Sequence, residues 1–393
     1  MPLRVAYVVH TFDMGGLERC VARLVNRLDP TRFEPIIVCM DRNGDAAQWL
    51  QNQDVPIVEL HTRAGNDPLV IRRLANTLRE NQIDIVHSHN WGTLLETVLA
   101  RRWAAVPCHI HAERGMSSVL THGLRARLRA RAIRWALNRA DAVVAVSESV
   151  RQSLLDRCGR LMREVQVIPN GVDVPAEPAA GRSRDELRAS LNVSPSAFVV
   201  GSVGRLVPIK EFGTAIDAVG QLVSRGSDVY LLLVGDGPEM DRLARHAKEA
   251  GLDDRVHLVG QQSDVGAWLA AMDLYVNVSR NEGMSQSILE AMAIGLPMVV
   301  TDVGQNATLA GGENPCGRVV VSGDCHAVAR AIAELHADRE LRRGFSHNAL
   351  ARHGEHYGIE KMICTYEELY TRLLGVHGTP EASEAETQAL IAG

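Results

Sequence analysis

The sequence predicts an α/β protein built from two doubly wound domains, each a parallel sheet with helices on both faces. Three observations lead to this class. The chain has 393 residues, a length that suits two domains. Short apolar runs alternate along it with segments of helical periodicity, as expected of strands joined by helical crossovers. Only 4% of the residues are aromatic and 33 are glycines, which fits a protein with many tight strand–helix turns.

Composition also excludes several classes of protein. The 42 basic and 47 acidic residues give a net charge of −5, so the overall charge gives no reason to expect a nucleic-acid partner. No apolar run approaches the ~18–20 residues of a membrane-spanning helix, and the start of the chain lacks the pattern of a secretory signal. The seven cysteines are scattered without a Cys-x-x-Cys spacing. We therefore expect reduced thiols in the cytoplasm, with neither a disulfide framework nor a zinc site.

The first half of the chain predicts one domain, residues 1–172. Apolar residues occupy nearly every position of its expected strands, as in a parallel sheet that is buried on both faces. These strands are residues 4–9, 36–40, 85–87, 109–111, 142–146 and 165–168. The segments with a period of about 3.6 residues between them are 17–28, 69–81, 93–104, 124–138 and 147–157.

The alternation restarts after residues 175–181, a segment rich in proline and alanine that we interpret as a linker. Strands are expected at 198–203, 229–234, 256–259, 274–276, 298–301 and 318–320, and helices at 213–224, 239–250, 265–271, 286–293 and 327–336. The second domain is thus predicted to span residues 173–358. A last helix is expected within 359–375, and the tail 376–393, rich in Glu, Ala and Thr, is expected to be disordered.

Charge is divided unevenly between the two predicted domains. Residues 1–172 hold 23 arginines against 17 acidic residues, whereas the remainder carries an excess of acidic residues. The basic excess is concentrated in an amphipathic helix expected from Leu124 to Arg139, where six arginines occur without an acidic residue. Two interpretations stay open. The helix is either a solvated one whose arginine stems cover apolar neighbours, or one that lies on an anionic membrane surface, where each basic residue contributes on the order of 1 kcal/mol.

Two turns of the first half are candidates for ligand contact. Gly15 and Gly16 directly precede a helix, so their amides would be able to approach a phosphate or sugar closely, although such glycines are also ordinary turn chemistry. Farther along, His87-Ser-His89 ends a strand. We expect its two imidazoles on opposite faces, with His87 in the core and His89, together with Asn90, in the crevice at the carboxyl ends of the strands.

In the second half, Arg205 and Lys210 lie between the strand 198–203 and the helix that follows it, which places both cations at the crevice. A guanidinium binds phosphate oxygens bidentately and an ammonium acts as a point charge, so the pair suits a nucleotide pyrophosphate. The alternative is an ordinary pair of surface cations. Lys210 is one of only three lysines in the chain.

The most informative segment is residues 277–297. A strand leads to Glu282 on a loop, residues 283–285 form the expected helix N-terminus, and Glu290 lies two turns along that helix. Free amides and the helix dipole at such an N-terminus bind phosphate oxygens. Glu290 is placed to accept the hydroxyls of a ribose, and Glu282 to meet sugar hydroxyls beside the phosphate. The alternative is that they are a dipole partner and a solvated helix residue.

The spacing Glu282-x₇-Glu290, followed by Ala-Met-Ala-x-Gly-x-Pro, resembles the donor-site signature of the family 4 retaining glycosyltransferases. Companion motifs occur in the order that this family shows: Gly15-Gly16-Leu-Glu-Arg, Asp84-Ile-Val-His-Ser-His89, Val146-Ser147-Glu, Ile168-Pro-Asn-Gly-Val-Asp173, Gly204-Arg205 with Lys210, and Val234-Gly-Asp-Gly-Pro-Glu239. The likeness spans about residues 4–375. It implies the GT-B architecture: a Rossmann-like acceptor domain, a Rossmann-like domain that holds a nucleotide-sugar donor, and a last helix, 359–375, that crosses back onto the first domain.

The resemblance also implies a role for each matching residue. Arg205 and Lys210 would bind and neutralise the donor diphosphate, which Gly16 would approach from the first domain. Glu290 would bind the ribose, and Glu282 would hold the transferred sugar. The helix amides that would assist Glu282 are those of Gly283, Met284 and Ser285. Catalysis is then chiefly electrostatic stabilisation of the departing nucleotide, and the family transfers the sugar with retention and without an enzyme nucleophile.

The sequence departs from the family pattern at two places. Many members end the third strand of the first domain with Thr-x-His-Gly, where this chain reads His109-Ile-His111-Ala-Glu113-Arg114-Gly115. Alignment on the glycine puts Arg114 in the place of the histidine, whereas His111 is the nearest imidazole. Either would contact the sugar or its phosphate, and we favour His111. Members also often carry a glutamate soon after the loop 301–304, where this chain has Asn306.

The sequence therefore predicts a metal-independent, retaining hexosyltransferase that moves a sugar from a nucleotide-diphosphate donor to a glycan or lipid-linked acceptor in bacterial polysaccharide or glycolipid synthesis. Because no Asp-x-Asp occurs, no metal is expected, and the donor substrate is the only small-molecule requirement. The expected location is the cytoplasm, on the inner face of the plasma membrane if the basic helix binds lipid. The alternatives are a GT-B-fold sugar-nucleotide epimerase, which the two-glutamate pattern disfavours, and a non-catalytic nucleotide-sugar-binding scaffold.

Overall fold

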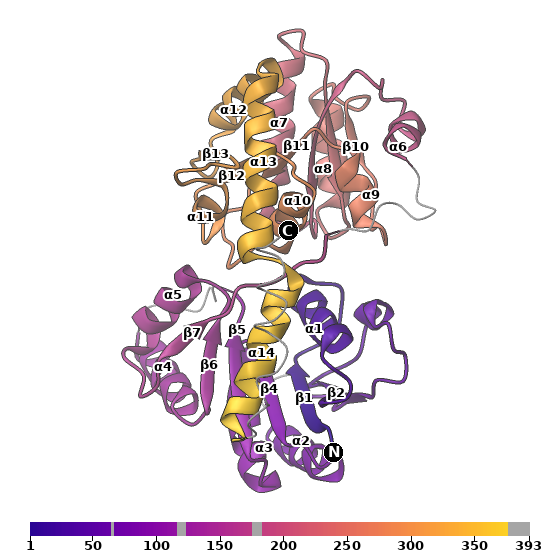
Figure 1. Cartoon of the computed structure of the whole chain (residues 1–393). Helices are drawn as coiled ribbons and strands as arrows, with labels where there is room; N and C mark the ends of the chain where they lie inside the picture. Colours follow the sequence, from indigo (N-terminus) through magenta and orange to yellow (C-terminus); the bar gives the residue numbers. More distant parts are fainter. Residues whose placement is uncertain (64–66, 116–122, 175–182, 376–393) are drawn as a thin grey trace, which may run out of the picture.

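The molecule has two parallel sheets, one in each half, as Figure 1 shows. The computed structural model describes residues 1–63, 67–115, 123–174 and 183–375. Within them the strand orders are β3-β2-β1-β4-β5-β6-β7 and β10-β9-β8-β11-β12-β13. The order reverses between β1 and β4 and again between β8 and β11, which is where a doubly wound sheet opens a crevice. The predicted α/β class with two doubly wound sheets is confirmed.

The first sheet and its helices come from the first half of the chain. Its strands are β1 Leu3–Val9, β2 Phe33–Cys39, β3 Ile57–Glu59, β4 Ile85–His89, β5 Cys108–Glu113, β6 Ala142–Ala145 and β7 Val165–Val167. Its helices are α1 Gly16–Arg27, α2 Leu69–Glu80, α3 Trp91–Ala104, α4 Leu124–Leu137 and α5 Glu148–Cys158, with a 3-10 turn at Asp45–Trp49. The strand period of two divides β1: Val5, Tyr7 and Val9 pack with α1, while Ala6 and Val8 pack on the opposite face.

The second sheet comes from the second half. Its strands are β8 Phe198–Val203, β9 Val229–Val234, β10 Val256–Leu258, β11 Leu274–Asn277, β12 Met298–Thr301 and β13 Gly317–Val320. Its helices are α6 Arg184–Ser190, α7 Phe212–Val223, α8 Met240–Glu249, α9 Val265–Ala270, α10 Gln286–Ala293, α11 Asn306–Ala310, α12 Cys325–Ala337 and α13 Arg339–His356, with a 3-10 turn at Pro208–Lys210.

Four elements were not expected from the sequence: β3, α6, α11 and α13. The first three are short, so they carry little periodicity. Helix α13 is long, but only Phe345, Ala349 and His353 are buried along it. An apolar stripe this narrow is a weak helix signal.

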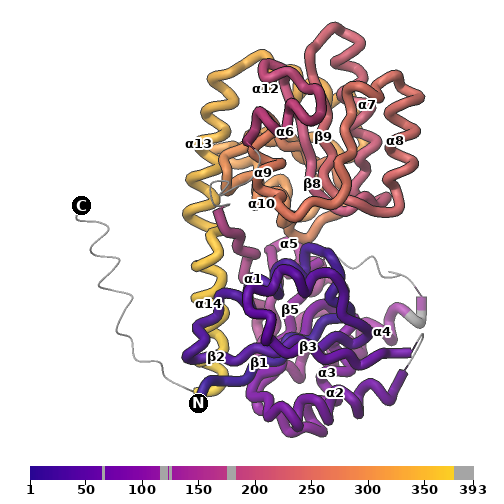
Figure 2. Tube along the Cα trace, turned by 90° about the vertical axis from the view of Figure 1, so that its right-hand side faces the viewer, coloured from indigo at the N-terminus to yellow at the C-terminus, as the bar shows by residue number. Residues whose placement is uncertain are grey.

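The last helix, α14 Ile359–Leu373, leaves the second half and packs on the first sheet beside α1, as Figures 1 and 2 both show. Tyr366 and Tyr370 are fully buried there. The Tyr370 hydroxyl lies 3.1 Å from that of Tyr7 and 2.8 Å from Nδ1 of His87. The two chain segments that join the halves run side by side, because the amide of Val172 donates to the carbonyl of Tyr357 (2.9 Å).

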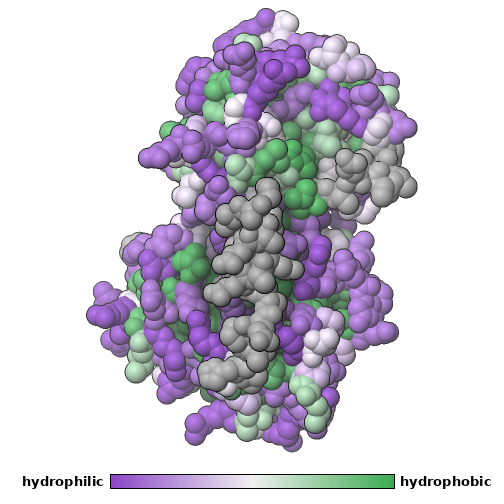
Figure 3. All heavy atoms as spheres, in the orientation of Figure 1, coloured by the Kyte–Doolittle hydropathy of each residue, from purple (hydrophilic) through white to green (hydrophobic). Residues whose placement is uncertain are grey.

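The two sheets differ in what they bury. The strands of the second bury uncharged polar residues, Ser202, Asn277 and Thr301, among aliphatic ones such as Val200 and Leu231. The first buries a cluster of ionisable groups along β4 and β5 and just after β5: His87, His89, His109, His111, Glu113 and Arg114, together with Ser88. Among the described helices, none combines the length and apolar character that a bilayer crossing requires. The face drawn in Figure 3 is mainly hydrophilic, with its hydrophobic residues in small groups.

Candidate active site

A cavity of about 710 Å³ lies where the carboxyl ends of the two sheets face each other. Its walls come from segments that follow β1, β4 and β5 in the first half and β8, β9 and β11 in the second, the position where doubly wound sheets bind ligands. The sequence-predicted residues that line it are Gly15, Gly16, Asn90, Arg114, Arg205, Lys210, Glu282, Gly283, Met284, Ser285 and Glu290. The structure thus brings together residues that lie far apart along the chain.

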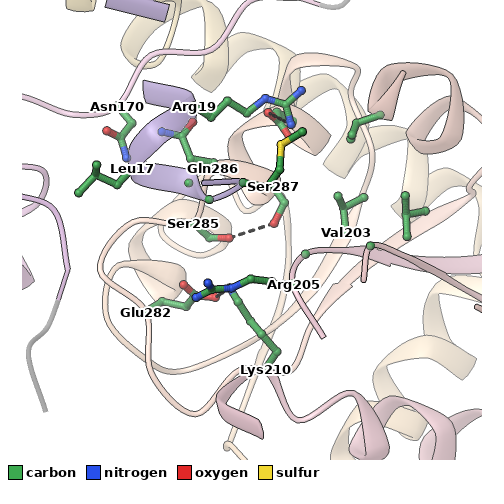
Figure 4. A pocket seen from close by; sticks show the side chains of 18 of the residues that line it. Leu17, Arg19, Asn170, Val203, Arg205, Lys210, Glu282, Ser285, Gln286 and Ser287 are labelled. Atoms are coloured by element: carbon green, nitrogen blue, oxygen red, sulfur yellow. Dashed lines mark hydrogen bonds and ion pairs between the residues drawn. The ribbon is translucent and has the colours of Figure 1, made fainter. Parts of the chain in front are cut away.

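The second-half wall carries both predicted cations and the first predicted glutamate. Figure 4 shows Arg205, Lys210 and Glu282 converging on one side of the cavity. The ammonium of Lys210 is ion-paired with Oε1 of Glu282, and the same oxygen accepts a hydrogen bond from the Ser279 hydroxyl (2.8 Å). A side chain at Gly304, which has φ +54°, would place its Cβ 1.9 Å from the Glu282 carbonyl oxygen. Only glycine therefore lets these two loops meet.

The N-terminus of α10 forms the next part of the wall. The Ser285 and Ser287 hydroxyls lie 3.2 Å apart, and Tyr275 donates to Ser287 (2.7 Å). A Cβ on Gly283 would come within 2.8 Å of the Arg114 carbonyl oxygen, so this glycine allows the first half to approach the helix. The first amides of a helix have no intrahelical acceptor and lie at the positive end of the helix dipole, so this end of α10 suits a phosphate.

Glu290 is only 5% exposed, yet it lines the cavity. Its Oε1 lies 2.7 Å from Nη2 of Arg23 and 3.5 Å from Nη1 of Arg19. Both arginines belong to α1 of the first half. The sequence did not single them out, although the spacing of four residues places both on one face of a helix.

The first-half wall includes the glycine turn, and the Glu18 carboxylate packs against Gly15 of that turn without lining the cavity. Gly16 lies against Gln286 of α10, whose Cγ would be 3.5 Å from a Cβ at that position. Burial raises the pKa of Glu18, in the first turn of α1, to about 7, although its own backbone amide and the charge of Arg205 act in the opposite direction. Glu18 belongs to the motif Gly15-Gly16-Leu-Glu-Arg, but the sequence did not indicate that its pKa would be raised.

The structure separates the two candidates at the end of β5. Arg114 is among the residues that line the cavity, and its guanidinium donates to His89 Nδ1 (3.1 Å), Asn170 Oδ1 (2.8 Å) and the Tyr366 hydroxyl (3.1 Å). His111 is fully buried outside the cavity wall, with Nδ1 2.9 Å from the Ser88 hydroxyl. Of the two candidates, Arg114 therefore borders the cavity and His111 does not.

The expectation for His87 and His89 requires correction. Their ring centroids lie 4.2 Å apart, so the two side chains share a face of β4 instead of pointing to opposite faces. Residues two apart on a strand do so because the side-chain period is two. His89 is 1% exposed and does not belong to the cavity wall, whereas its neighbour Asn90 does. Burial, reinforced by neighbouring charges, lowers the pKa of both imidazoles well below the ordinary value.

Three other expectations fall partly or wholly outside the described residues: the linker 175–181, the tail 376–393 and the side chains of Leu124 and Arg125 at the start of the basic helix. In the part of the chain that is described, no group of three or more His, Cys, Asp or Glu residues is arranged to hold a metal ion.

Comparisons with known proteins give a consistent result. Residues 14–175 match the family model Glycosyltransferase Family 4, and residues 197–338 match Glycosyl transferases group 1. The chain is 30% identical over 326 residues to D-inositol 3-phosphate glycosyltransferase from Salinispora arenicola, an alignment that covers 77% of this chain and 72% of that protein. It is 24% identical over 379 residues to the UDP-Gal:alpha-D-GlcNAc-diphosphoundecaprenol alpha-1,3-galactosyltransferase of Escherichia coli, covering 94% and 96% of the two chains.

Among solved structures, the crystal structure of Anabaena HepE in complex with UDP and glucose superposes with a TM-score of 0.80 at 22% identity. The superposition covers 94% of this chain and 99% of HepE. At this level of identity the likeness shows a shared fold.

Proposed function

The chain belongs to the family 4 glycosyltransferases, the glycosyl transferases of group 1, and from this premise we propose that it transfers a hexosyl group with retention and without a metal ion. The observation that carries the proposal is one cavity in which two cations, a free helix N-terminus and two carboxylates from the second half face the first half. This set matches a nucleotide-diphosphate sugar: positive groups for the diphosphate, and carboxylates for the hydroxyls on either side of it.

The charges assign a task to each group. Lys210 and Arg205 neutralise the diphosphate, which is the leaving group, so they stabilise the charge that develops as the glycosidic bond breaks. The amides at the start of α10 add a fixed dipole. Glu282 now pairs with Lys210. When phosphate oxygens of the donor accept hydrogen bonds from the Lys210 ammonium, the Glu282 carboxylate becomes available to accept hydrogen bonds from the sugar.

Arg114 is a first-half residue that lines the cavity, and its carbonyl oxygen would lie 2.8 Å from a Cβ on Gly283. We propose that its guanidinium, not His111, faces the transferred sugar or its phosphate. Uridine nucleotides are the first donors to test, because HepE was crystallised with UDP and glucose.

For the acceptor we propose a glycan or a lipid-linked sugar, a class supported by the diphosphoundecaprenol-linked substrate in the name of the Escherichia coli relative. A second cavity of about 510 Å³ opens in the first half at the switch point between β1 and β4, with His10, Asp67 and Glu96 among its lining residues. It offers room for part of an acceptor beside the main cavity.

We further propose that α4 contacts the inner face of the membrane. Arg127, Arg131 and Arg134 are exposed, and Leu128 (55%) and Trp135 (40%) lie exposed among them, an arrangement suited to anionic headgroups. Co-sedimentation with liposomes tests this contact: binding should require anionic lipid and should weaken when the three arginines are changed to Gln. Binding that is equally strong with neutral and anionic lipid would contradict the proposed membrane contact.

The transferase assignment is tested with Lys210→Ala and Glu282→Ala, assayed for sugar transfer and for donor hydrolysis with a panel of UDP- and GDP-sugars. Loss of one preorganised group that stabilises transition-state charge typically lowers kcat by about 10²–10³-fold, so we expect a loss of that size for Lys210→Ala. Lys248→Ala, on the outer helix α8, is the matched lysine control and should retain full activity. Undiminished transfer by both site variants would refute the site, and donor binding without any turnover would point to a scaffold.

A further inference from the structure

Helix α1 of the first half presents arginines to the second half at a spacing of four residues: Arg19, Arg23 and Arg27. Arg23 is the best held of the three. Its Nη1 donates to Gln286 Oε1 (2.6 Å), its Nη2 to Glu290 Oε1 (2.7 Å), and its Nε lies 3.8 Å from Asp173 Oδ2. One guanidinium thus joins α1 to two positions on α10 and to the segment between the halves.

Both contacts of Glu290 with α1 go to the same carboxylate oxygen. Oε1 receives Arg23 at 2.7 Å and Arg19 at 3.5 Å. Within the described residues, Oε2 has no hydrogen-bond or ion-pair partner. Because the residue lines the cavity, the pairing leaves one oxygen for a ligand and fixes the other.

The surroundings of this pair keep it in place. Arg23 is not part of the cavity wall, so a ligand does not need to displace it. Arg19 is part of that wall, and its guanidinium carbon lies 5.3 Å from the ring centroid of Trp49. Figure 4 shows Arg19 and Gln286 on the side of the cavity opposite Lys210 and Glu282. A carboxylate held by charge-assisted hydrogen bonds in a nearly buried site has a defined orientation before its ligand arrives.

We propose that Arg23 is a positioning residue for the donor: it holds Oε1 of Glu290 so that Oε2 accepts the ribose hydroxyls. The inference rests on the proposed function and on the role at the ribose that the family resemblance implies for Glu290. It adds that ribose recognition depends on the first half, through Arg23 and secondarily Arg19, although the nucleotide-binding residues themselves belong to the second half. The donor is therefore bound in full only when α1 is docked on α10.

The test compares nucleotides that differ only in the ribose. Calorimetry gives the affinities of UDP and 2′-deoxy-UDP, or of GDP and 2′-deoxy-GDP if the guanosine nucleotide binds more tightly, for the wild type, Arg23→Gln, Glu290→Gln and the double variant. A hydrogen bond to a charged group contributes enough to give a preference for the ribonucleotide on the order of 10-fold. We expect Glu290→Gln to abolish that preference and Arg23→Gln to reduce it at least threefold. In the Glu290→Gln background, Arg23→Gln should change nothing further.

Arg27→Gln is the matched control, because Asp173 is the only ion-pair partner of Arg27 among the described residues and Arg27 is exposed; its preference should equal that of the wild type. The affinity for inorganic pyrophosphate should be unchanged in Arg23→Gln, a result that a general disturbance of the fold would not give. Arg23→Lys should restore part of the ribose preference.

The outcomes separate this inference from the proposed function. If Glu290→Gln keeps the full ribose preference, the assignment of the donor site itself is wrong. If Glu290→Gln loses it while Arg23→Gln keeps it, only the role of Arg23 is overturned. Tighter binding of the ribonucleotide by Arg23→Gln would also overturn it, because the arginine would then compete with the ribose.

Discussion

Among the residues that the structure describes, two arginines are buried, one in each half, and their partners differ in charge. Arg188 of the second half is 2% exposed. It donates to the carboxylate of Asp273 (2.7 Å) and to the carbonyls of Ala271 (2.9 Å) and Ala197 (3.0 Å). Asp273 stands at the start of β11, so this ion pair lies at the amino edge of the sheet, opposite the cavity.

Arg114 of the first half is 8% exposed and stands at the other edge, after the carboxyl end of β5. The described groups that it contacts are His89, Asn170, Tyr366 and the thiol of Cys20, and no carboxylate is ion-paired with it. A buried charge is costly unless it is paired. The comparison teaches that the buried arginine of the second half has a counter-charge beside it, whereas Arg114, which borders the cavity, has none among the described residues.

The largest expected effect is a loss of stability in acid that is greater in the first half than in the second. Burial lowers the pKa of His87, His89 and His109 well below the ordinary 6.5, so all three are neutral in the folded protein, whereas the unfolded chain binds protons below pH 6.5. Their stabilisation is complete above pH 6.5 and is lost as the pH falls toward the lowered folded values. Below pH 6.5 each histidine lowers the free energy of unfolding by about 1.4 kcal/mol per pH unit, so the three together lower it by up to about 4 kcal/mol per unit.

The second half should lose less stability in this range, because burial lowers the pKa of two histidines there, His257 and His353, and it has a further limit in stronger acid. Burial of Asp273 opposes its ionisation, but the Val199 amide and Arg188 outweigh burial and lower its pKa below 3.8. Its contribution is therefore present above pH 3.8 and is lost only in stronger acid. Native-state hydrogen exchange at pH 7.5 and 5.5, corrected for intrinsic rates, should show a larger loss of protection in β4 and β5 than in β8 and β9. Equal loss in both sheets would break the comparison.

The next effect concerns the paired arginine. Asp273→Asn leaves Arg188 buried without a counter-charge, which typically costs about 3–5 kcal/mol. Urea denaturation followed through the second half should show a loss of this size. Asp228→Asn is the matched control, because Asp228 pairs with Arg255 at the surface and such pairs contribute about 0–1 kcal/mol. A small loss of stability for both variants would mean that the buried ion pair contributes no more to stability than the surface pair does.

The smallest effect on stability is expected for the unpaired arginine. Arg114→Met leaves Asn170 and Tyr366 without a donor, a loss of about 1–3 kcal/mol, but it should lower kcat by about 100-fold if the guanidinium faces the reacting sugar. Steady-state transfer and urea denaturation measured together distinguish the two roles. Arg79→Met, on the outer face of α2, should change neither. Full activity with a large loss of stability would make Arg114 a structural residue like Arg188.

Much of the fold could be predicted from the sequence because buried parallel strands are continuous apolar runs. Strands β8, β9 and β12 have the predicted bounds. Helix α13 was missed because only three of its residues are buried, and β3 because an edge strand of three residues carries little pattern.

The residues of the candidate site also fall into two groups, those that the sequence could predict and those that it could not. Arg205, Lys210 and Glu282 follow strand ends, so their place at the crevice could be inferred from local order. The Arg23–Glu290 pair joins residues 267 positions apart and depends on how the halves dock, which no local pattern encodes. The choice between His111 and Arg114 depended on which side of β5 each side chain occupies relative to the cavity.

The crossing of α14 has a consequence for synthesis of the chain. All strands of the second sheet lie in one continuous stretch, so that half can complete its core as soon as α13 has left the ribosome. The first sheet is made earlier but must wait for Tyr366 and Tyr370, the latter 363 residues after its partner Tyr7. At about 5–20 residues per second, the interval between synthesis of β7, the last strand of the first sheet, and synthesis of Tyr370 is on the order of tens of seconds. The half that is translated first is thus the last to finish folding, and during that interval its unfilled face is the part of the nascent protein that most needs protection from aggregation.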